Sequence, residues 1–139
     1  MIYLSIEKTI KINVPVEKAW DIFTNPVITR QLGGEYISEW KAGSSINWQV
    51  TNGKIYTNGI ILAIESGKIL KHSQLDMNDS SKLISVITYR FTEEGQCTIL
   101  DAKEELNYEM TAEQFKDVSK GWDLALKAVK EVAEKMEPI

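Results

Sequence analysis

Residues 119–136 read SKGWDLALKAVKEVAEKM, and this stretch decides the fold class. Its hydrophobic side chains recur at three- and four-residue intervals, which is the spacing of one face of an α-helix. Thr111 and Gln114 form a capping-box pattern before it, and Met110 with Phe115 fits the accompanying hydrophobic staple. The whole helix would span about 39 Å at 1.5 Å per residue. A hydrophobic stripe of that length needs a whole sheet to bury it.

Six segments with a period of two precede this helix, and short turn sequences such as ESGK separate them. The predicted strands cover residues 36–40, 45–51, 54–65, 68–75, 83–92 and 96–108. Because the links are short, we expect antiparallel neighbours in a meander. The strand that contains GIILAI is hydrophobic on both faces. We expect it near the centre of the sheet or against a helix on its back.

The N-terminal part predicts one more strand and two short helices. Hydrophobic and polar residues alternate over residues 2–14, with Lys8 as the one charge on the hydrophobic side. The segment VEKAWDIF has helical spacing, and a second helix is expected to begin at Asn25 and to end at Gly33. The fold class is therefore α+β, with a strand, two helices, six strands and a helix in that order. A curved antiparallel sheet of about seven strands would wrap around the long C-terminal helix.

The composition indicates a globular protein, with 43% hydrophobic and 26% charged residues. The net charge is −4 and the basic residues are scattered, which argues against nucleic acid as a partner. Cys97 is the only cysteine, so an intrachain disulfide is excluded and a reducing compartment is indicated. The first residues lack a signal-peptide pattern, and the longest hydrophobic run is too short for a membrane span. We expect a single cytoplasmic domain over residues 1–139, without membrane insertion.

Five stretches, in the same order, resemble the START-like (SRPBCC, helix-grip) superfamily. Within it, they resemble the domain named after the activator of the heat-shock-protein-90 ATPase. The stretches are IKINVPVEKAWDIFTNP (10–26), QLGGEYISEWKAGSSINW (31–48), YTNGIILAIESGKILKHSQ (56–74), TYRFTEEGQCTIL (88–100) and GWDLALKAVKE (121–131). The resemblance implies a sheet that grips the C-terminal helix around a cavity, which often takes an apolar small molecule. Members of the superfamily include binding proteins, cyclases, hydrolases and a co-chaperone, so the fold alone does not choose a function.

Three positions depart from the pattern of these relatives. Gln74 stands where a tryptophan is frequent, His72 stands where an aromatic residue is frequent, and Glu104 stands where a histidine is common. We therefore expect a cavity that is more polar in these places than the cavities of the relatives.

The resemblance and the strand alternation together select a group of candidate cavity-lining, ligand-binding residues. The group comprises Trp48, Tyr56, His72, Gln74, Tyr89, Glu104, Phe115 and Trp122. An empty apolar cavity of ~300 Å³ would cost ~7 kcal/mol, at about 24 cal/mol per Å³. That cost rivals the roughly 5–15 kcal/mol by which a whole domain is stable. The polar members of the group therefore favour water or a ligand in the space.

Each candidate also has a purely structural interpretation. His72 can be a core residue with satisfied hydrogen bonds, and a register shift of one residue would turn Glu104 to solvent. Trp48 and Tyr56 can pack together instead of lining a cavity mouth, and Trp122 can belong to the core.

We expect a non-catalytic protein that binds an apolar or aromatic small molecule between the sheet and the C-terminal helix. The sequence has no motif for a nucleophile, a phosphate loop or a zinc site, so we expect no catalytic residue, no metal and no cofactor. Other functions stay open. One is a co-chaperone-like or other protein-binding role, with a chaperone partner. Another is homodimerisation through the GIILAI strand, and a third is a cyclase or hydratase with His72 and Glu104 as acid–base groups.

Overall fold

The computed structural model describes residues 5–50 and 52–135 of the 139-residue chain. In chain order its elements are β1 (Ser5–Ile12), α1 (Val16–Thr24), α2 (Pro26–Thr29), the 3₁₀ helix η1 (Arg30–Leu32), β2 (Gly34–Ser38), β3 (Ser45–Val50), β4 (Gly59–Glu65), β5 (Ile69–Leu75), β6 (Leu83–Glu94), β7 (Cys97–Leu106) and α3 (Ala112–Lys135). This order confirms the predicted arrangement, to which η1 is an addition. Residues 2–4 of the predicted first strand, residue 51 and Met136 of the predicted stripe lie outside the described residues.

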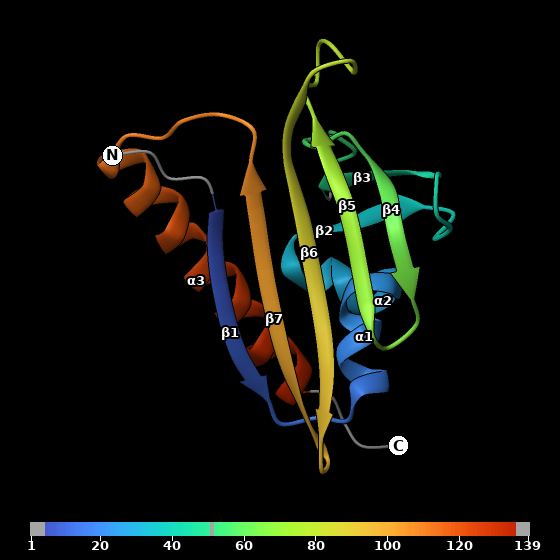
Figure 1. Cartoon of the computed structure of the whole chain (residues 1–139). Helices are drawn as coiled ribbons and strands as arrows, with labels where there is room; N and C mark the ends of the chain where they lie inside the picture. The colour runs from blue at the N-terminus through green and yellow to red at the C-terminus, as the bar shows by residue number, and fades with distance from the viewer. Residues whose placement is uncertain (1–4, 51, 136–139) are drawn as a thin grey trace.

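The seven strands form one antiparallel sheet in the order β1-β7-β6-β5-β4-β3-β2. Strands β2 to β7 run as a meander, and β1 closes the sheet by pairing with β7. The helices lie on one face of the sheet, and in the described part of the chain no helix covers the other, outer face (Figure 1). The predicted α+β helix-grip fold is therefore confirmed. None of the described helices is long and apolar enough to cross a membrane.

Helix α3 begins at the predicted cap. The backbone N–H of Thr111 donates to Oε1 of Gln114 at 3.0 Å, and the N–H of Gln114 donates to Oγ1 of Thr111 at 3.1 Å. This reciprocal pair satisfies two backbone donors that the first helical turn leaves without partners. Leu126, Val129 and Ala133 in the second half of the helix are buried in the core. The helix is therefore anchored mainly by its C-terminal half.

Lys8, the charge on the hydrophobic side of the first strand, has a partner on the helix. Its Nζ lies 3.0 Å from Oδ1 of Asp123 in α3. A second lysine, Lys130 of α3, donates a hydrogen bond from Nζ to the carbonyl oxygen of Lys11 at 2.8 Å. These polar contacts hold α3 along β1, at the edge of the sheet.

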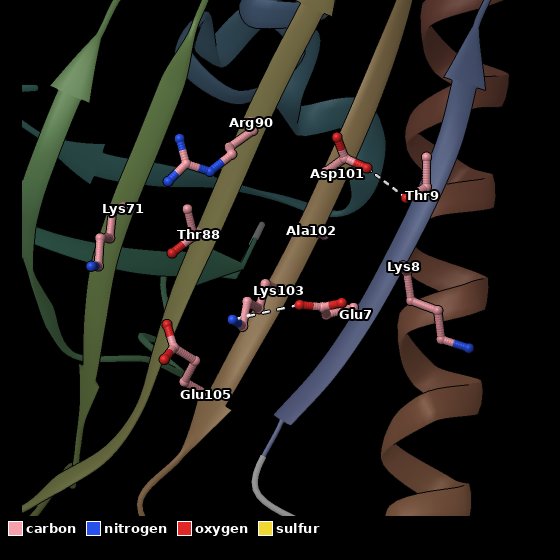
Figure 2. A pocket seen from close by; sticks show the side chains of 10 residues that line it. All are labelled: Glu7, Lys8, Thr9, Lys71, Thr88, Arg90, Asp101, Ala102, Lys103 and Glu105. Carbon is pink, nitrogen blue, oxygen red and sulfur yellow. Dashed lines mark hydrogen bonds and ion pairs between the residues drawn. The ribbon is translucent and has the colours of Figure 1, made fainter.

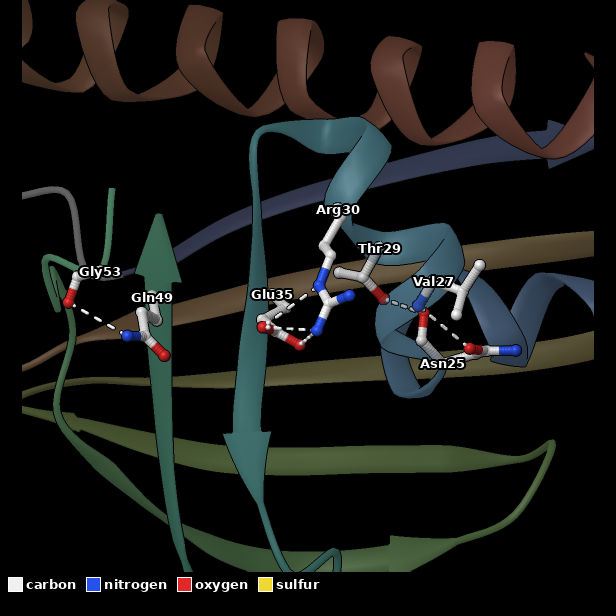
Figure 3. Close-up of polar contacts among 7 residues, drawn as sticks. All are labelled: Asn25, Val27, Thr29, Arg30, Glu35, Gln49 and Gly53. Atoms are coloured by element: carbon white, nitrogen blue, oxygen red, sulfur yellow. Dashed lines mark hydrogen bonds and ion pairs between the residues drawn. The ribbon is translucent and has the colours of Figure 1, made fainter. Parts of the chain in front are cut away.

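The segment between β1 and β2 folds through local signals. Asn25 accepts a hydrogen bond from the N–H of Val27 at 3.1 Å and caps α2, as predicted (Figure 3). Gly33 ends η1 with φ at 96°, a left-handed conformation that favours glycine. Arg30 contacts the Glu35 carboxylate at 3.3 Å across this turn (Figure 3). The chain thus reverses directly from η1 into β2.

Two predicted strand ranges were wrong. The strand predicted at 36–40 is β2, which begins at Gly34 and ends at Ser38, because Trp40 has a left-handed φ of 58° and turns the chain. The strand predicted at 54–65 is regular only from Gly59 onward. A side chain at Gly59 would collide with the carbonyl oxygen of Ser73, so the backbones approach closely there. Earlier residues make only isolated bridges, such as Gln49 with Ile55.

The GIILAI strand lies inside the sheet, as expected, between β3 and β5. Ile61 is buried and Ile64 packs against the core on the inner face. Ile60 and Leu62 are 41% and 47% exposed. The hydrophobic residues on the outer side of β4 therefore face solvent rather than a helix.

Candidate functional site

Two adjoining pockets of about 240 and 370 Å³ lie between the sheet and α3. They share four wall residues, which are Tyr36 of β2, Tyr89 of β6, and Trp122 and Ala125 of α3. The smaller one, here the aromatic pocket, is also lined by Phe23, Thr29, Leu32, Trp48, Leu126, Ala128 and Val129. The larger one, here the carboxylate pocket, is also lined by Gln74, Ile87, Glu104, Val118 and Gly121.

Glu104 on β7 is fixed by two neutral donors. The indole Nε1–H of Trp122 donates to its Oε1 at 2.9 Å, and the hydroxyl of Ser85 donates to its Oε2 at 2.7 Å. Its backbone pairs with Ile6 and Ile87 of the neighbouring strands, both buried core residues. This register turns the carboxylate toward α3, so the alternative with Glu104 facing solvent is wrong.

Aromatic side chains form a continuous cluster around the shared wall. The Tyr36 ring lies edge-on to Trp48 with centroids 4.9 Å apart, and Tyr89 lies 4.9 Å from Phe23 and 5.9 Å from Trp122. Such offset and edge contacts are the favoured geometries of aromatic pairs. The cluster gives both pockets rigid, largely apolar walls.

The two tyrosine hydroxyls in this wall stay protonated at neutral pH. Burial raises the pKa of Tyr36 above 10.0, although its hydrogen bond with Tyr89 opposes the change. Burial raises the pKa of Tyr89 well above 10.0, and the nearby Tyr36 and Glu104 raise it further. Both phenols are therefore neutral hydrogen-bonding groups and not bases.

His72 on β5 lies behind this wall. It is 4% exposed, and its ring centroid is 6.3 Å from those of Tyr36 and Tyr89. Nδ1 lies 3.1 Å from the carbonyl oxygen of Ser73, which can only accept, so Nδ1 carries the proton. Nε2 is buried and has no hydrogen-bond partner among the described residues. Burial lowers the pKa of His72, against smaller opposing effects of the Ser73 carbonyl and Glu104, so the ring is neutral at pH 7.

The structure brings five of the eight predicted residues together. Trp48 lines the aromatic pocket, Gln74 and Glu104 line the carboxylate pocket, and Tyr89 and Trp122 line both. His72 is close to them but lines neither pocket.

Tyr56 and Phe115 lie elsewhere. Tyr56 is 53% exposed in the irregular segment before β4, with Nζ of Lys54 4.9 Å from its ring centroid. It lines neither pocket, and its backbone N–H donates to the carbonyl oxygen of Trp48 at 2.9 Å. Phe115 is half-buried in the first turns of α3, ahead of the helical residues that line the two pockets.

Sequence reasoning missed several residues of the site. Ser85, which holds Glu104, falls two residues before Ile87 on the same period-two pattern, so this signal was available. Tyr36 is directly opposite Trp48 in the β2–β3 hairpin. The turn between the strands brings them near each other, but the sequence does not fix the register that pairs them.

Other pockets have a different character. A pocket of about 350 Å³ on the outer face of the sheet is lined by charged side chains of both signs (Figure 2). There Lys103 pairs with Glu7 at 3.5 Å, and Thr9 donates a hydrogen bond to Asp101. The lining of a pocket of about 590 Å³ beside α1 includes the carboxylates Glu17, Asp21 and Glu93 and the ammonium group of Lys68. Across the described residues, no group of three or more His, Cys, Asp or Glu could hold a metal ion.

Residues 13–134 match the protein family described as activator of Hsp90 ATPase homolog 1-like protein. The chain belongs to this family. Membership confirms the resemblance to the START-like, helix-grip superfamily that the sequence indicated. A comparison with curated proteins finds no match.

Solved structures support the fold assignment. A protein from Cytophaga hutchinsonii is 26% identical, with a TM-score of 0.76 and coverage of 96% of each chain. The Aha1 dimer from Colwellia psychrerythraea is 15% identical, with a TM-score of 0.76, and the alignment covers 98% of this chain and 100% of that one. CalU16 from Micromonospora echinospora is 21% identical, with a TM-score of 0.73 and coverage of 94% and 76%. The last two likenesses show the fold alone.

Proposed function

We propose that this protein binds an apolar or aromatic small molecule in the two pockets between the sheet and α3, without catalysing a reaction. The observation that carries the proposal is the wall of Tyr36, Tyr89 and Trp122, which both pockets share. Small-molecule sites are concave, mostly apolar and aromatic, and contain a few placed polar groups. Gln74 and Glu104 supply such groups in the carboxylate pocket.

The same geometry speaks against His72 and Glu104 as an acid–base pair. Ile87 stands between them in the sheet, since it pairs with His72 on one side and with Glu104 on the other. Neighbouring strands are about 4.8 Å apart, so the backbones of β5 and β7, with β6 between them, are about 10 Å apart. His72 also lines neither pocket. A binding role needs no such pair.

Thermal unfolding against fatty acids, sterols, flavonoids and other aromatic metabolites tests the proposal. A ligand at about 100 times its dissociation constant adds about 2.7 kcal/mol to the free energy of unfolding. For a domain of this size the expected increase in Tm is several degrees. An unchanged Tm with every compound of the panel would count against small-molecule binding.

A substitution in the shared wall tests the location of binding. Ala125→Trp introduces a large ring where the two pockets meet, at an exposed helical position that should tolerate it. We expect any ligand found in the panel to bind at least about tenfold more weakly, because its space is filled. Ala112→Trp is the matched control, at an exposed position in the first turn of α3 that lines neither pocket. Equal loss of affinity in both variants would contradict the location.

Self-association is a second candidate role, favoured by the exposed Ile60 and Leu62 on the outer face of β4. A related structure is that of the Aha1 dimer from Colwellia psychrerythraea. Sedimentation velocity should then find a dimer that Leu62→Lys dissociates. Leu124→Lys, at an exposed position on α3, should leave the dimer intact. A monomeric wild-type protein at high micromolar concentration would exclude this role.

A co-chaperone-like role is suggested by the description of the family. Addition of the purified chain to an Hsp90 ATPase assay tests it, and an unchanged rate would rule it out.

A further inference from the structure

The charge that lines the two pockets is of one sign only, negative. Of the residues that line the aromatic and carboxylate pockets, Glu104 is the only one with a carboxyl group, and none is a lysine, arginine or histidine. The pockets therefore present a carboxylate within largely apolar and aromatic walls. That environment is unfavourable for an anionic ligand, because a second negative charge close to Glu104 is repelled.

Within the described residues, Glu104 makes no ion pair. Lys8, on the inner side of the neighbouring strand β1, is paired with Asp123 at 3.0 Å. Neutral donors hold Glu104 instead, one on each oxygen, from Trp122 and Ser85. Each carboxylate oxygen can accept two hydrogen bonds, so both oxygens keep an acceptor site. The carboxylate is thus fixed in position while its charge is not neutralised by the protein.

The aromatic wall also favours positive charge. A cation close to the face of a tryptophan or tyrosine is attracted by the quadrupole of the ring. Tyr36, Tyr89 and Trp122 border the carboxylate pocket together with Glu104. Burial is the main cause of the raised pKa of Tyr89, and the nearby Glu104 is a smaller one. Gln74 adds an amide oxygen as a further acceptor on the same pocket wall.

We propose that the ligand of this site is an amine with an apolar or aromatic body, whose ammonium group binds Glu104 in the carboxylate pocket. The body of the ligand then occupies the aromatic pocket, against Trp48 and Trp122. The inference rests on the proposed small-molecule binding and names its ligand class. It excludes fatty acids and other carboxylates as preferred ligands.

Three indole compounds with the same ring test the ligand class. Isothermal titration calorimetry at pH 7 compares tryptamine, which is cationic, tryptophol, which is neutral, and indole-3-acetate, which is anionic. We expect tryptamine to bind about tenfold more tightly than tryptophol, because a charge-assisted hydrogen bond is about twice as strong as a neutral one. Indole-3-acetate should bind most weakly. Equal affinities, or tighter binding of the acid, would overturn the inference.

Two variants locate the preference at the carboxylate. Glu104→Gln keeps an acceptor for Trp122 or Ser85 and removes the charge, so tryptamine and tryptophol should bind equally. Gln74→Lys places a cation in the same pocket and should weaken tryptamine binding by about tenfold while improving the binding of indole-3-acetate. Gln31→Lys is the control with the same change of charge, at an exposed residue of η1 outside both pockets. If Glu104→Gln does not fold, Gln74→Lys alone carries the test.

The outcomes separate this inference from the proposed function. A preference for tryptamine that is lost in Glu104→Gln and in Gln74→Lys, but kept in Gln31→Lys, supports it. A preference that survives both pocket variants overturns it. Absence of tryptamine binding, with saturable binding of a neutral or anionic compound blocked by Ala125→Trp, overturns the amine preference and leaves the binding function standing. Absence of binding by every compound overturns both.

Discussion

At the residue scale, His72 makes stability depend on pH in a defined direction. Burial lowers the pKa of His72 in the folded protein below its ordinary value of 6.5. Between the folded pKa and about 6.5 the unfolded chain therefore binds more protons than the folded one. The free energy of unfolding must fall as the pH decreases through this window, and the contribution is fully favourable above about 6.5.

Removal of this histidine should flatten that part of the pH profile. We expect the free energy of unfolding of the wild type to fall more between pH 7.5 and 5.5 than that of His72→Gln. Glutamine retains an N–H that can donate to the carbonyl of Ser73, the partner of Nδ1. Urea denaturation at a series of pH values measures the difference between the two slopes. Parallel profiles would show that His72 titrates alike in both states.

At the element scale, the two halves of α3 have different roles. The second half buries Leu126, Val129 and Ala133 in the core. The first half supplies Val118, Gly121 and Trp122 to the carboxylate pocket. The first half therefore borders the carboxylate pocket, whereas Leu126 and Val129 of the second half belong to the core and also line the aromatic pocket. The periodicity predicts the whole stripe equally well, because it reports which residues share a face and not what that face contacts.

Glycine substitutions distinguish a helical position from a close backbone approach. A Cβ at Gly121 in α3 would meet no atom within 4 Å, so Gly121→Ala should raise the free energy of unfolding by about 0.5–1 kcal/mol. A Cβ at Gly59 would collide with the backbone carbonyl of Ser73, which cannot move aside. Gly59→Ala should lower the free energy of unfolding by about 1–3 kcal/mol. Chemical denaturation measures both, and equal effects would contradict these local geometries.

The order of the elements along the chain and the helix caps could be predicted from the sequence, because each depends on local periodicity or on residues a few positions apart. The cap formed by Thr111 and Gln114 is an example. The start of β4 at Gly59 could not be predicted, because it depends on the close approach to Ser73, fourteen residues further along the chain.

Some residues of the candidate site could likewise be predicted from the sequence, and others could not. The family resemblance and the alternation along the strands together predicted that Gln74, Tyr89 and Glu104 face inward, and the structure brings them to the pockets. The sequence did not predict Tyr36 as a wall residue, because its role depends on pairing with Trp48 across a hairpin. Local patterns fix the face of a residue, whereas a pocket depends on the registers of several strands relative to a distant helix.

At the scale of the whole molecule, the sheet has one face covered by helices and one face open (Figure 1). The covered face holds the aromatic wall and the carboxylate of Glu104, whereas the open face carries mixed charges and the exposed Ile60 and Leu62. The proposed small-molecule binding and the proposed self-association therefore use opposite faces of the sheet. They can be tested separately, with Ala125→Trp for the first and Leu62→Lys for the second. That residues 1–139 form a single cytoplasmic domain stays a prediction.

The four tryptophans provide the most direct test of binding between the sheet and α3. Trp48 and Trp122 line the pockets, whereas Trp20 of α1 packs against Phe91 of β6 and lines neither of them. The decisive measurement is the position of the indole N–H resonances in heteronuclear NMR spectra during titration with tryptamine and with the thermal-shift panel. We predict that at least one compound shifts the Trp48 and Trp122 resonances saturably and leaves that of Trp20 in place. Four unmoved resonances throughout, or a shift confined to Trp20, would contradict binding at this site.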